Sequence, residues 1–284
     1  MFKVGIIGSE NSHATAFTEI FNVKQQYEDV RVVAVYGEDP EASQKISDKY
    51  GVPIVKPEDM LPMVDAVMIT SRHGGLHYGY AKPFIEAGKP LFVDKPLCCC
   101  AKEAKEMLDL AKAKNVPIVG GSSLKVTKDT FLAKAKADEA RAKGELFGGL
   151  VYAPINLDNP YGGYYFYSAH LMETLIRVFG YDPVAVTAKR YNDSISGVVE
   201  YKDFAVSYCY TAGAYNYGCT IVAKDADVNV PISLDGAYDA EVSHFVEMLH
   251  TGVSPQTYTE LLLPVKLLNA IEKAFIENVK VTIE

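Results

Sequence analysis

The sequence has few basic residues and no long apolar run, which limits the partners it can have. Acidic residues outnumber basic ones by 36 to 28, and the formal net charge is −8. This surplus of negative charge disfavours nucleic acid and anionic membranes as general partners. No apolar run approaches the roughly 18 residues of a membrane span. We therefore expect no nucleic acid and no membrane among its partners.

Cysteine is scarce too, and its spacing suits neither disulfides nor zinc. Cys98, Cys99 and Cys100 are adjacent, Cys209 and Cys219 lie much further along the chain, and no Cys-x-x-Cys spacing occurs. The first residues also lack the charged, apolar and small-residue pattern of a secretion signal. We expect five reduced thiols and a cytoplasmic location.

What the chain does have is a regular alternation of short apolar runs and helical patterns over its first 121 residues. The apolar runs are continuous and rich in β-branched residues, as in strands covered by helices on both faces. Expected strands are 3–7, 30–35, 64–70, 91–93 and 116–119, with helices at 14–25, 41–50, 79–87 and 102–113. This alternation predicts an α/β fold whose N-terminal domain, residues 1–121, is a Rossmann-type doubly wound parallel sheet.

The pattern changes after residue 121. Helical patterns at 128–142, 168–179, 238–250 and 260–275 accompany strand patterns at 184–188, 197–201, 204–211 and 217–223. Because these strands follow one another without helices between them, they predict a mostly antiparallel open sheet. We expect residues 122–284 to form an α+β domain for substrate binding and oligomerisation.

The first expected strand ends in a turn that follows a dinucleotide-binding pattern only in part. That pattern, G-x-G-x-x-G, places glycines for the bend, for the approach of phosphate and for helix packing. Here the six residues are Gly8, Ser9, Glu10, Asn11, Ser12 and His13. Asn11 and Ser12 can still cap the next helix and leave its amides facing an anion. A plain capped turn without a nucleotide is the alternative.

The end of the second expected strand bears on the choice between NAD and NADP. An acidic residue there usually accepts hydrogen bonds from the ribose hydroxyls, but Gly37 occupies that place. Glu38 can substitute, and no arginine stands nearby to bind a 2′-phosphate. We expect NAD as the cofactor, with NADP as the alternative.

Several motifs occur along the chain in a characteristic order and spacing. They are Gly5-Ile6-Ile7-Gly8, Val33-Ala34-Val35, Glu38-Asp39-Pro40-Glu41, the run 65–70 with the later His77, Asp94-Lys95-Pro96-Leu97, residues 144–148, and Glu241-Val242-Ser243-His244-Phe245 before Gly252. Together they resemble the motifs of the Gfo/Idh/MocA family of NAD(P)-dependent sugar and cyclitol oxidoreductases. The resemblance extends over almost the whole chain. It implies a cofactor site built from the turn at 8–13 and from Gly37, Glu38, Thr70, Ser71, His73, His77, Asp94 and Lys95.

The resemblance also implies two catalytic residues. Lys95 matches the lysine of the family's Glu-Lys-Pro motif, which binds the reacting hydroxyl and the nicotinamide region, and Pro96 matches its proline. His170 matches the acid–base histidine of the family's Asp-x-x-x-His motif, but Phe166 stands where the aspartate is expected. Either His170 works with another partner, or the reaction differs, or activity has been lost.

The chemistry of these residue types agrees with such roles. Oxidation of an alcohol needs a base for the proton and a cofactor for the hydride. Histidine suits the first task because it titrates near neutral pH, and Lys95 would stabilise a developing alkoxide. A metal site made by His13, His73, His77 and His170 has no supporting spacing, so no metal is expected.

Tyrosines crowd the loop expected before the His170 helix. Tyr164, Tyr165 and Tyr167 are candidates to bind substrate, because tyrosine rings stack on the apolar faces of sugars and also offer a hydroxyl. One of them could replace the missing aspartate beside His170. The alternative is that these rings pack the sheet or a subunit interface.

The main hypothesis is an oxidoreductase that transfers a hydride between NAD and a sugar, polyol or cyclitol hydroxyl, assembled as a homodimer or homotetramer. A second hypothesis is a non-catalytic nucleotide- or sugar-binding sensor that retains the fold, favoured by the departures at Glu10, Gly37 and Phe166. A third is a lyase or glycosidase that uses tightly bound NAD.

Overall fold

The computed structural model describes residues 1–224 and 227–283. Within them the chain forms two units, each with its own sheet and core. Unit 1 contains Met1–Gly121 and Tyr238–Leu262, and unit 2 contains the described residues of 122–237 and those from Leu263 onward. The sequence patterns assigned 238–262 to the second domain, so the return of this segment to unit 1 differs from the expectation.

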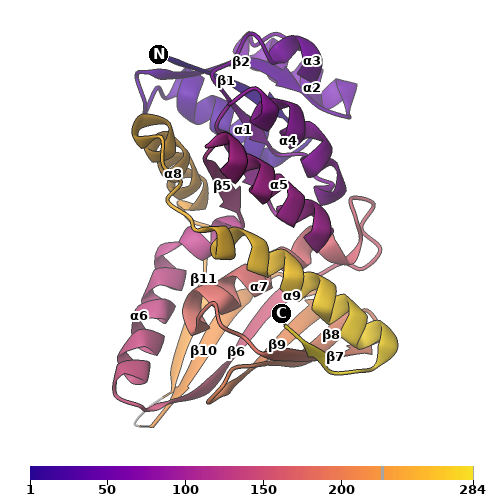
Figure 1. Ribbon diagram of the computed structural model, residues 1–284, viewed down its shortest axis with the longest axis vertical. Coiled ribbons are helices and arrows are strands. Elements are labelled where there is room, and N and C mark those ends of the chain that lie inside the picture. The colour runs from indigo at the N-terminus through magenta and orange to yellow at the C-terminus, as the bar shows by residue number, and fades with distance from the viewer. Residues whose placement is uncertain (225–226, 284) are drawn as a thin grey trace. The chain divides into compact units, whose positions relative to one another are not determined.

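Unit 1 is built on a five-stranded parallel sheet in the order β2-β1-β3-β4-β5 (Figure 1). The pairing of each strand with its neighbours is parallel throughout. The strands are β1 (Phe2–Ile7), β2 (Val30–Tyr36), β3 (Ala66–Ile69), β4 (Leu91–Asp94) and β5 (Ile118–Gly121). The α/β class and the doubly wound parallel sheet predicted from the apolar runs are thus confirmed.

Helices connect these strands, as the sequence alternation requires. They are α1 (Ser12–Thr18), α2 (Pro40–Tyr50), α3 (Pro57–Met60), α4 (His77–Glu86) and α5 (Ala101–Lys114), with a short 3₁₀ turn η2 (Gly74–Leu76) before α4. The two ends of α2 show how capping residues mark the limits of a helix in the sequence. The Asp39 carboxylate accepts hydrogen bonds from the first amides, Pro40 opens the helix, and Gly51 ends it at a φ of 67°.

The first helix differs from the expected 14–25. It begins at Ser12, because Asn11 caps it, and after Thr18 it continues as a π-helical turn η1 (Glu19–Val23). In this turn the Asn22 side chain exchanges two hydrogen bonds of 2.8 and 2.9 Å with the backbone of Val32 in β2. These bonds fasten the irregular turn to the sheet.

Helix α8 (Ala237–Thr251) completes the core of unit 1 although it is formed late in the chain. Val242 and Phe245 are fully buried in the same cluster as Phe17 and Phe92, and the rings of Phe92 and Phe245 lie 6.4 Å apart, edge to face. The helical periodicity of 238–250 predicts an apolar face, but it does not say which core that face joins.

Unit 2 contains a seven-stranded sheet in the order β11-β10-β6-β9-β8-β7-β12. All neighbouring strands are antiparallel except β6 and β9, so the mostly antiparallel sheet predicted for this region is confirmed. The strands are β6 (Leu146–Ile155), β7 (Ala185–Tyr191), β8 (Ser194–Glu200), β9 (Ala205–Ala212), β10 (Tyr217–Ala223), β11 (Val228–Ile232) and β12 (Val281–Thr282). The sequence patterns did not resolve β11 and β12.

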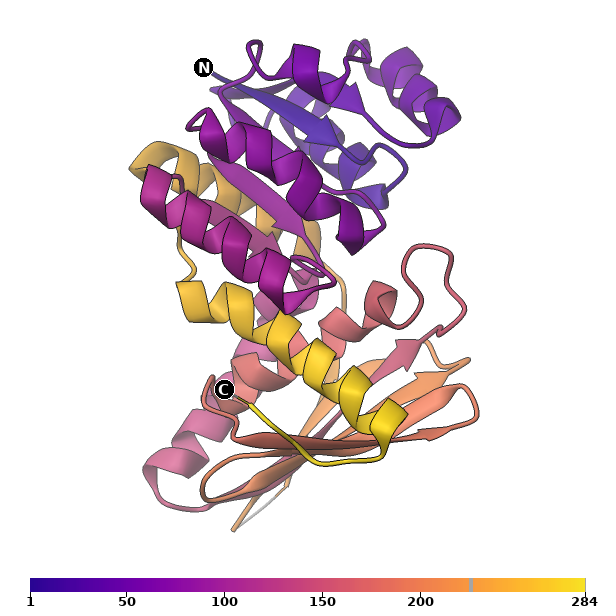
Figure 2. The ribbon, with the colours of Figure 1, turned by 45° about the vertical axis from the view of Figure 1, so that its right-hand side comes forward.

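Three helices pack with this sheet: α6 (Lys128–Ala142), α7 (Tyr164–Phe179) and α9 (Tyr258–Glu277) (Figure 2). A 3₁₀ turn, η3 (Ser123–Val126), precedes α6. α7 is buried on nearly all sides, which its high apolar content permits. It starts at Tyr164, four residues before the expected 168, because Gly163 at a φ of 55° ends the preceding loop. The tyrosines expected in that loop therefore lie on the helix.

Candidate active site

Asn11 joins three parts of unit 1 at the carboxyl ends of its strands. Its side-chain amide donates to the Thr70 carbonyl oxygen after β3 at 2.8 Å and to Asp94 Oδ2 at the end of β4 at 2.9 Å. Its Oδ1 accepts from the backbone amide of His13 at 3.2 Å, which caps α1. The turn after β1 is thereby fixed to the two neighbouring strand ends. Ligands of open parallel sheets bind at this edge.

Gly8 lets the turn pass close to the end of β3. Its φ is 117°, and a Cβ there would overlap the backbone nitrogen of Ser71 and lie 2.6 Å from Ser71 Cα. Thr70 Oγ1 donates to the Gly8 carbonyl oxygen at 3.1 Å. The first glycine of the expected pattern is therefore required both by its backbone conformation and by lack of space.

His13 stands where the third glycine of the pattern would be, and it is buried between two acids. Its Nδ1 lies 2.9 Å from Asn11 Oδ1 and 3.7 Å from Asp94 Oδ2. Its Nε2 lies 3.2 Å from Glu241 Oε2 on α8. Burial disfavours the charged ring, but the carboxylates of Asp94 and Glu241 outweigh burial and raise the pKa of His13 above its ordinary 6.5.

Within the described residues, His13, Asp94 and Glu241 form a group whose ligand atoms could hold a metal ion. The two acids face opposite nitrogens of the His13 ring, which is the arrangement of an imidazolium between two carboxylates. This group also differs from the four histidines considered from the sequence, of which it contains only His13.

The loop that carries Lys95 is held by its neighbours. Asp94 Oδ1 accepts from the Lys95 backbone amide at 2.7 Å, and the Lys95 side chain is buried. The Lys95–Pro96 peptide bond is cis. The ring of His77 lies between the carbonyl oxygens of Pro96 and Ser71, with its Nδ1 and Nε2 at 2.9 and 2.8 Å from them. His77, expected to contact the cofactor, is fully buried and instead ties the Lys95 loop to the end of β3.

The remaining predicted cofactor residues also follow the carboxyl ends of strands in unit 1. His73 Nδ1 accepts from the Gly75 amide at 3.0 Å and caps η2. Ser9 Oγ lies 2.6 Å from Ser43 Oγ on α2. Glu38 is exposed, and its carboxylate accepts a hydrogen bond from the Tyr80 hydroxyl. Ser12 Oγ lies 3.0 Å from the Tyr238 hydroxyl.

The crevice of unit 1 has features that suit a dinucleotide. Gly8 brings bare backbone to the strand ends, and Asn11 caps a helix that begins there. Glu10 Oε2 is a buried oxygen without a hydrogen-bond partner in the described residues, so a hydroxyl group of a ligand would satisfy it. Glu10 itself occupies the place of the second glycine, and its side chain points toward Gly37.

In unit 2, His170 has a hydrogen-bond partner that the sequence patterns did not reveal. Its Nδ1 lies 2.7 Å from Ser122 Oγ. Ser122 Oγ also accepts from the Leu124 amide at 3.2 Å as the cap of η3. Phe166, in the place of the expected aspartate, lies one turn earlier on α7 and packs on the rings of Tyr161 and Tyr167. The hydroxyl that caps η3 thus lies at hydrogen-bond distance from His170 Nδ1.

A buried ion pair lies one turn further along α7. Lys125 Nζ on η3 donates to Glu173 Oε2 at 2.6 Å, and both side chains are less than a tenth exposed. Together with the Ser122–His170 bond it joins η3 to α7 at two successive turns. Nothing in the spacing of Lys125 and Glu173, 48 positions apart, indicates this pairing.

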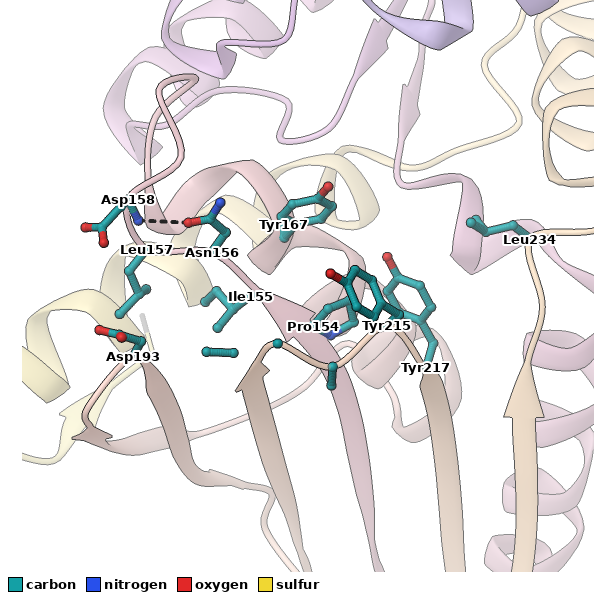
Figure 3. A pocket seen from close by; sticks show the side chains of 13 residues that line it. Pro154, Ile155, Asn156, Leu157, Asp158, Tyr167, Asp193, Tyr215, Tyr217 and Leu234 are labelled. Carbon is teal, nitrogen blue, oxygen red and sulfur yellow. Dashed lines mark hydrogen bonds between the residues drawn. The ribbon is translucent and has the colours of Figure 1, made fainter.

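Unit 2 also has a cavity of about 670 Å³ beside α7 (Figure 3). Its wall includes the rings of Tyr167, Tyr215 and Tyr217 and, from other loops, the carboxylates of Asp158 and Asp193. The volume lies within the usual range for small-molecule sites, roughly 300–1,000 Å³. Its volume and its aromatic lining suit a polar ring.

The cavity lies next to His170, whose ring centre is 5.9 Å from that of Tyr217 and 6.4 Å from that of Tyr167. Of the tyrosines considered from the sequence, Tyr167 lines it. Tyr164 is buried in the core against Tyr210 and other rings.

Tyr165 also serves the core of unit 2. Its hydroxyl donates to Glu272 Oε2 at 2.6 Å and accepts from Asn269 at 2.8 Å, both on α9. Tyr215 and Tyr217, on the loop into β10 and at its start, line the cavity instead. They carried no motif in the sequence.

Comparison with known proteins agrees with the arrangement in unit 1. Residues 2–121 match the model of the oxidoreductase family with an NAD-binding Rossmann fold, GFO_IDH_MocA. These residues are thus similar to the NAD-binding domain of the Gfo/Idh/MocA family. The resemblance stated from the motifs is confirmed over this range, and the expected cofactor, NAD, is the one that the family description names.

A curated relative of this chain is the uncharacterised oxidoreductase YhhX of Escherichia coli (strain K12). The two are 28% identical over 150 residues, which are 44% of this chain and 43% of the relative. The chain thus matches less than half the length of that relative.

Solved structures of similar fold cover both units. A putative myo-inositol dehydrogenase from Sinorhizobium meliloti 1021 has a TM-score of 0.85 at 17% identity and covers all of both chains. A myo-inositol dehydrogenase from Lactobacillus casei in complex with NAD(H) and myo-inositol has a TM-score of 0.86 at 16% identity, over 100% of this chain and 97% of that one. At this identity the likeness establishes the fold. In the described parts of the chain, no helix combines the length and apolar character needed to cross a membrane.

Proposed function

We propose that this protein is an NAD-dependent dehydrogenase that oxidises a hydroxyl group of a cyclitol, sugar or polyol. The observation that carries the proposal is the position of His170, held through Nδ1 by Ser122 and adjoining a tyrosine-lined cavity. This site belongs to a chain whose residues 2–121 are those of an oxidoreductase family.

Unit 1 would hold the cofactor at the carboxyl ends of β1, β3 and β4. The turn 8–13 would approach the phosphates, with Gly8 giving access to the backbone and Asn11 capping α1. Thr70 and Ser71 would lie along its course, since both are buried at the end of β3. When bound, NAD supplies an acceptor for the hydride.

His170 would take the proton of the substrate hydroxyl. In the tautomer with hydrogen on Nδ1, the ring donates to Ser122 Oγ and presents Nε2 as the proton acceptor. Ser122 Oγ can accept from both Nδ1 and the Leu124 amide, because a hydroxyl oxygen has two lone pairs. In this proposal the ammonium group of Lys95 stabilises negative charge on the substrate oxygen.

The cavity in unit 2 suits a compact molecule with many hydroxyl groups. Tyr167, Tyr215 and Tyr217 present aromatic faces for the apolar faces of a ring. Asp158 and Asp193 are acceptors for hydroxyl hydrogens. Because a similarly folded dehydrogenase was crystallised with myo-inositol, inositols are the first substrates to test.

The test is NAD reduction by the purified protein with inositol isomers, aldoses and linear polyols. We expect turnover with at least one of them, and loss of turnover in His170→Asn and in Lys95→Ala with NAD affinity retained in His170→Asn. Tyr215→Ala should raise KM by about three- to tenfold with little change in stability, because this ring is 88% exposed. Tyr191→Ala, an exposed tyrosine outside the cavity, is the control.

Two results would point to the other hypotheses. NAD binding without turnover on any substrate favours the sensor. Cofactor that copurifies and cycles without net NADH favours a lyase or glycosidase.

We also propose that the protein is a homodimer or homotetramer that contacts its copies through the outer face of the seven-stranded sheet. Leu150, Tyr152 and Val222 are more than a third exposed on adjacent strands β6 and β10. Light scattering of the wild type and of Val222→Lys tests this assembly, and an unchanged mass in the variant counts against it.

A further inference from the structure

Glu10 and Gly37, two departures from the dinucleotide-binding pattern, lie against each other in the structure. A Cβ at Gly37 would overlap Ser9 Oγ and lie 2.6 Å from Glu10 Oε2. A side chain at position 37 is therefore excluded while Ser9 and Glu10 keep their places. The two departures are one rearrangement: the acid is missing from the end of β2, and a carboxylate from the turn after β1 stands beside the gap.

The Glu10 carboxylate is fixed at one oxygen only. Oε1 accepts from the Arg72 amide, just after β3, at 3.2 Å. Oε2 is buried and accepts no hydrogen bond from any described residue. A buried carboxylate oxygen without a donor is costly, and a ligand hydroxyl would relieve that cost.

The two acids that follow β2, Glu38 and Asp39, are engaged elsewhere, and the Asp39 carboxylate caps α2. Glu38 is exposed and accepts from the Tyr80 hydroxyl, and burial together with this bond raises the pKa of Tyr80. The tyrosine therefore stays protonated and keeps donating to Glu38. Glu10, by contrast, borders a cavity of about 320 Å³ between the turn and α2.

We propose that Glu10 supplies the carboxylate that binds the adenosine ribose hydroxyls of the dinucleotide, in place of the acid absent at Gly37. The inference rests on the proposed binding of NAD. An acid in this role accepts hydrogen bonds from the 2′- and 3′-hydroxyls and repels a 2′-phosphate. Glu10 therefore makes the protein prefer NAD to NADP, although Lys45 and Lys49 line the same cavity and attract phosphate.

Calorimetric titration of the full-length protein with NAD and with NADP tests the proposal without relying on turnover. We expect tighter binding of NAD than of NADP by the wild type. Glu10→Gln should weaken NAD binding by about tenfold or more, since charge-assisted hydrogen bonds are lost, and should narrow the preference over NADP. Glu58→Gln, at an exposed acid of α3 that does not line this cavity, is the matched control and should bind NAD as the wild type does.

A triple variant moves the acid back to the end of β2. Gly37→Asp alone should lose NAD binding or stability, because its side chain meets Ser9 and Glu10. In Ser9→Gly/Glu10→Gly/Gly37→Asp both obstructing side chains are removed, and NAD binding should return to within about tenfold of the wild type. Thermal unfolding of each variant separates lost folding from lost binding.

Three outcomes would overturn the proposal: NAD binding that is unchanged in Glu10→Gln, NAD binding that tightens in Glu10→Gly, or a wild type that prefers NADP. The tightening would mean that Glu10 obstructs the crevice. A wild type that binds neither nucleotide defeats the proposed function as well. NAD binding that depends on Glu10 but brings no turnover defeats only the assignment as a dehydrogenase.

Discussion

The side-chain amide of Asn11 and the carboxylate of Asp94 are joined by a hydrogen bond of 2.9 Å between residues 83 positions apart. Asp94 in turn accepts from the backbone amide of Lys95. The helix cap after β1 and the loop that carries the lysine are thus parts of one buried network. A substitution at Asn11 should therefore alter both the turn 8–13 and the position of Lys95.

Replacing Asn11 tests this network. Asn11→Ala removes the cap of α1 and leaves Asp94 with one donor fewer, which should lower the free energy of unfolding by about 2–4 kcal/mol. Asn11→Ser keeps a capping oxygen but cannot reach Asp94, so it should recover about 1 kcal/mol of that loss. Urea denaturation measures both. If Asn11→Ser is as stable as the wild type, the bond to Asp94 contributes nothing.

Ser122 should matter to catalysis through His170 rather than through substrate. In Ser122→Ala the Nδ1 partner at 2.7 Å is lost, and we expect kcat to fall by about tenfold or more while KM changes little. Ser122→Thr retains a hydroxyl and should restore most of kcat.

A purely structural role for Ser122 would lower stability without moving the pH profile of kcat. The ¹⁵N chemical shifts of the His170 ring give a readout that needs no turnover. Identical shifts in the wild type and Ser122→Ala would show that Ser122 does not set the tautomer.

His13 should make stability fall as pH rises above neutrality. Its folded-state pKa lies above the ordinary 6.5 because Asp94 and Glu241 outweigh burial and the repulsion from Lys95. The folded protein then binds more protons than the unfolded chain above pH 6.5, so this stabilisation is complete below that pH and is lost as pH rises through the folded-state pKa. His13→Gln should flatten this decline in urea denaturation between pH 6 and 9.

His77 should make the folded protein less stable as the pH falls below neutrality. Burial lowers the pKa of His77 in the folded state, so the unfolded chain binds the extra proton below pH 6.5 and stability falls as the solution becomes more acid. His77→Asn should reduce the part of this acid slope that is present between pH 6.5 and 5. An unchanged slope would mean that His77 is protonated when folded, with both of its nitrogens donating.

The buried pair of Lys125 and Glu173 should be costly to break on one side only. Glu173→Gln leaves the Lys125 ammonium without its carboxylate at 2.6 Å and should lower the free energy of unfolding by about 3–5 kcal/mol. The double variant Lys125→Met/Glu173→Leu removes both charges and should be closer to the wild type. If the double variant loses as much free energy of unfolding as Lys125→Met and Glu173→Leu lose when measured separately and added, the two charges do not interact.

The sequence predicts best where the structure depends on local patterns. The continuous β-branched runs gave the parallel sheet, and Asn11 was recognisable as a helix cap from its place after Gly8. The partner of His170 was out of reach, because Ser122 lies 48 positions away and nothing local marks it. Glu241 reaches His13 only because α8 returns to the first core.

Side-chain direction was equally hidden from the sequence. Tyr164 and Tyr167 belong to one run of aromatic residues, yet one is buried in the core and the other lines a cavity. Both lie in the first turn of α7, so their different surroundings depend on what packs against each ring, and no local pattern in the sequence states that.

The return of Tyr238–Leu262 to unit 1 has a consequence for synthesis on the ribosome. Phe17 and Phe92 pack with Val242 and Phe245, so the first core stays incomplete until α8 has been translated, after most of unit 2. Unit 2, whose sequence lies mostly inside this interval, has its main strands available earlier. A nascent chain arrested at residue 121 should therefore expose aromatic surface and recruit chaperones, whereas one that extends through α9 and β12 should not.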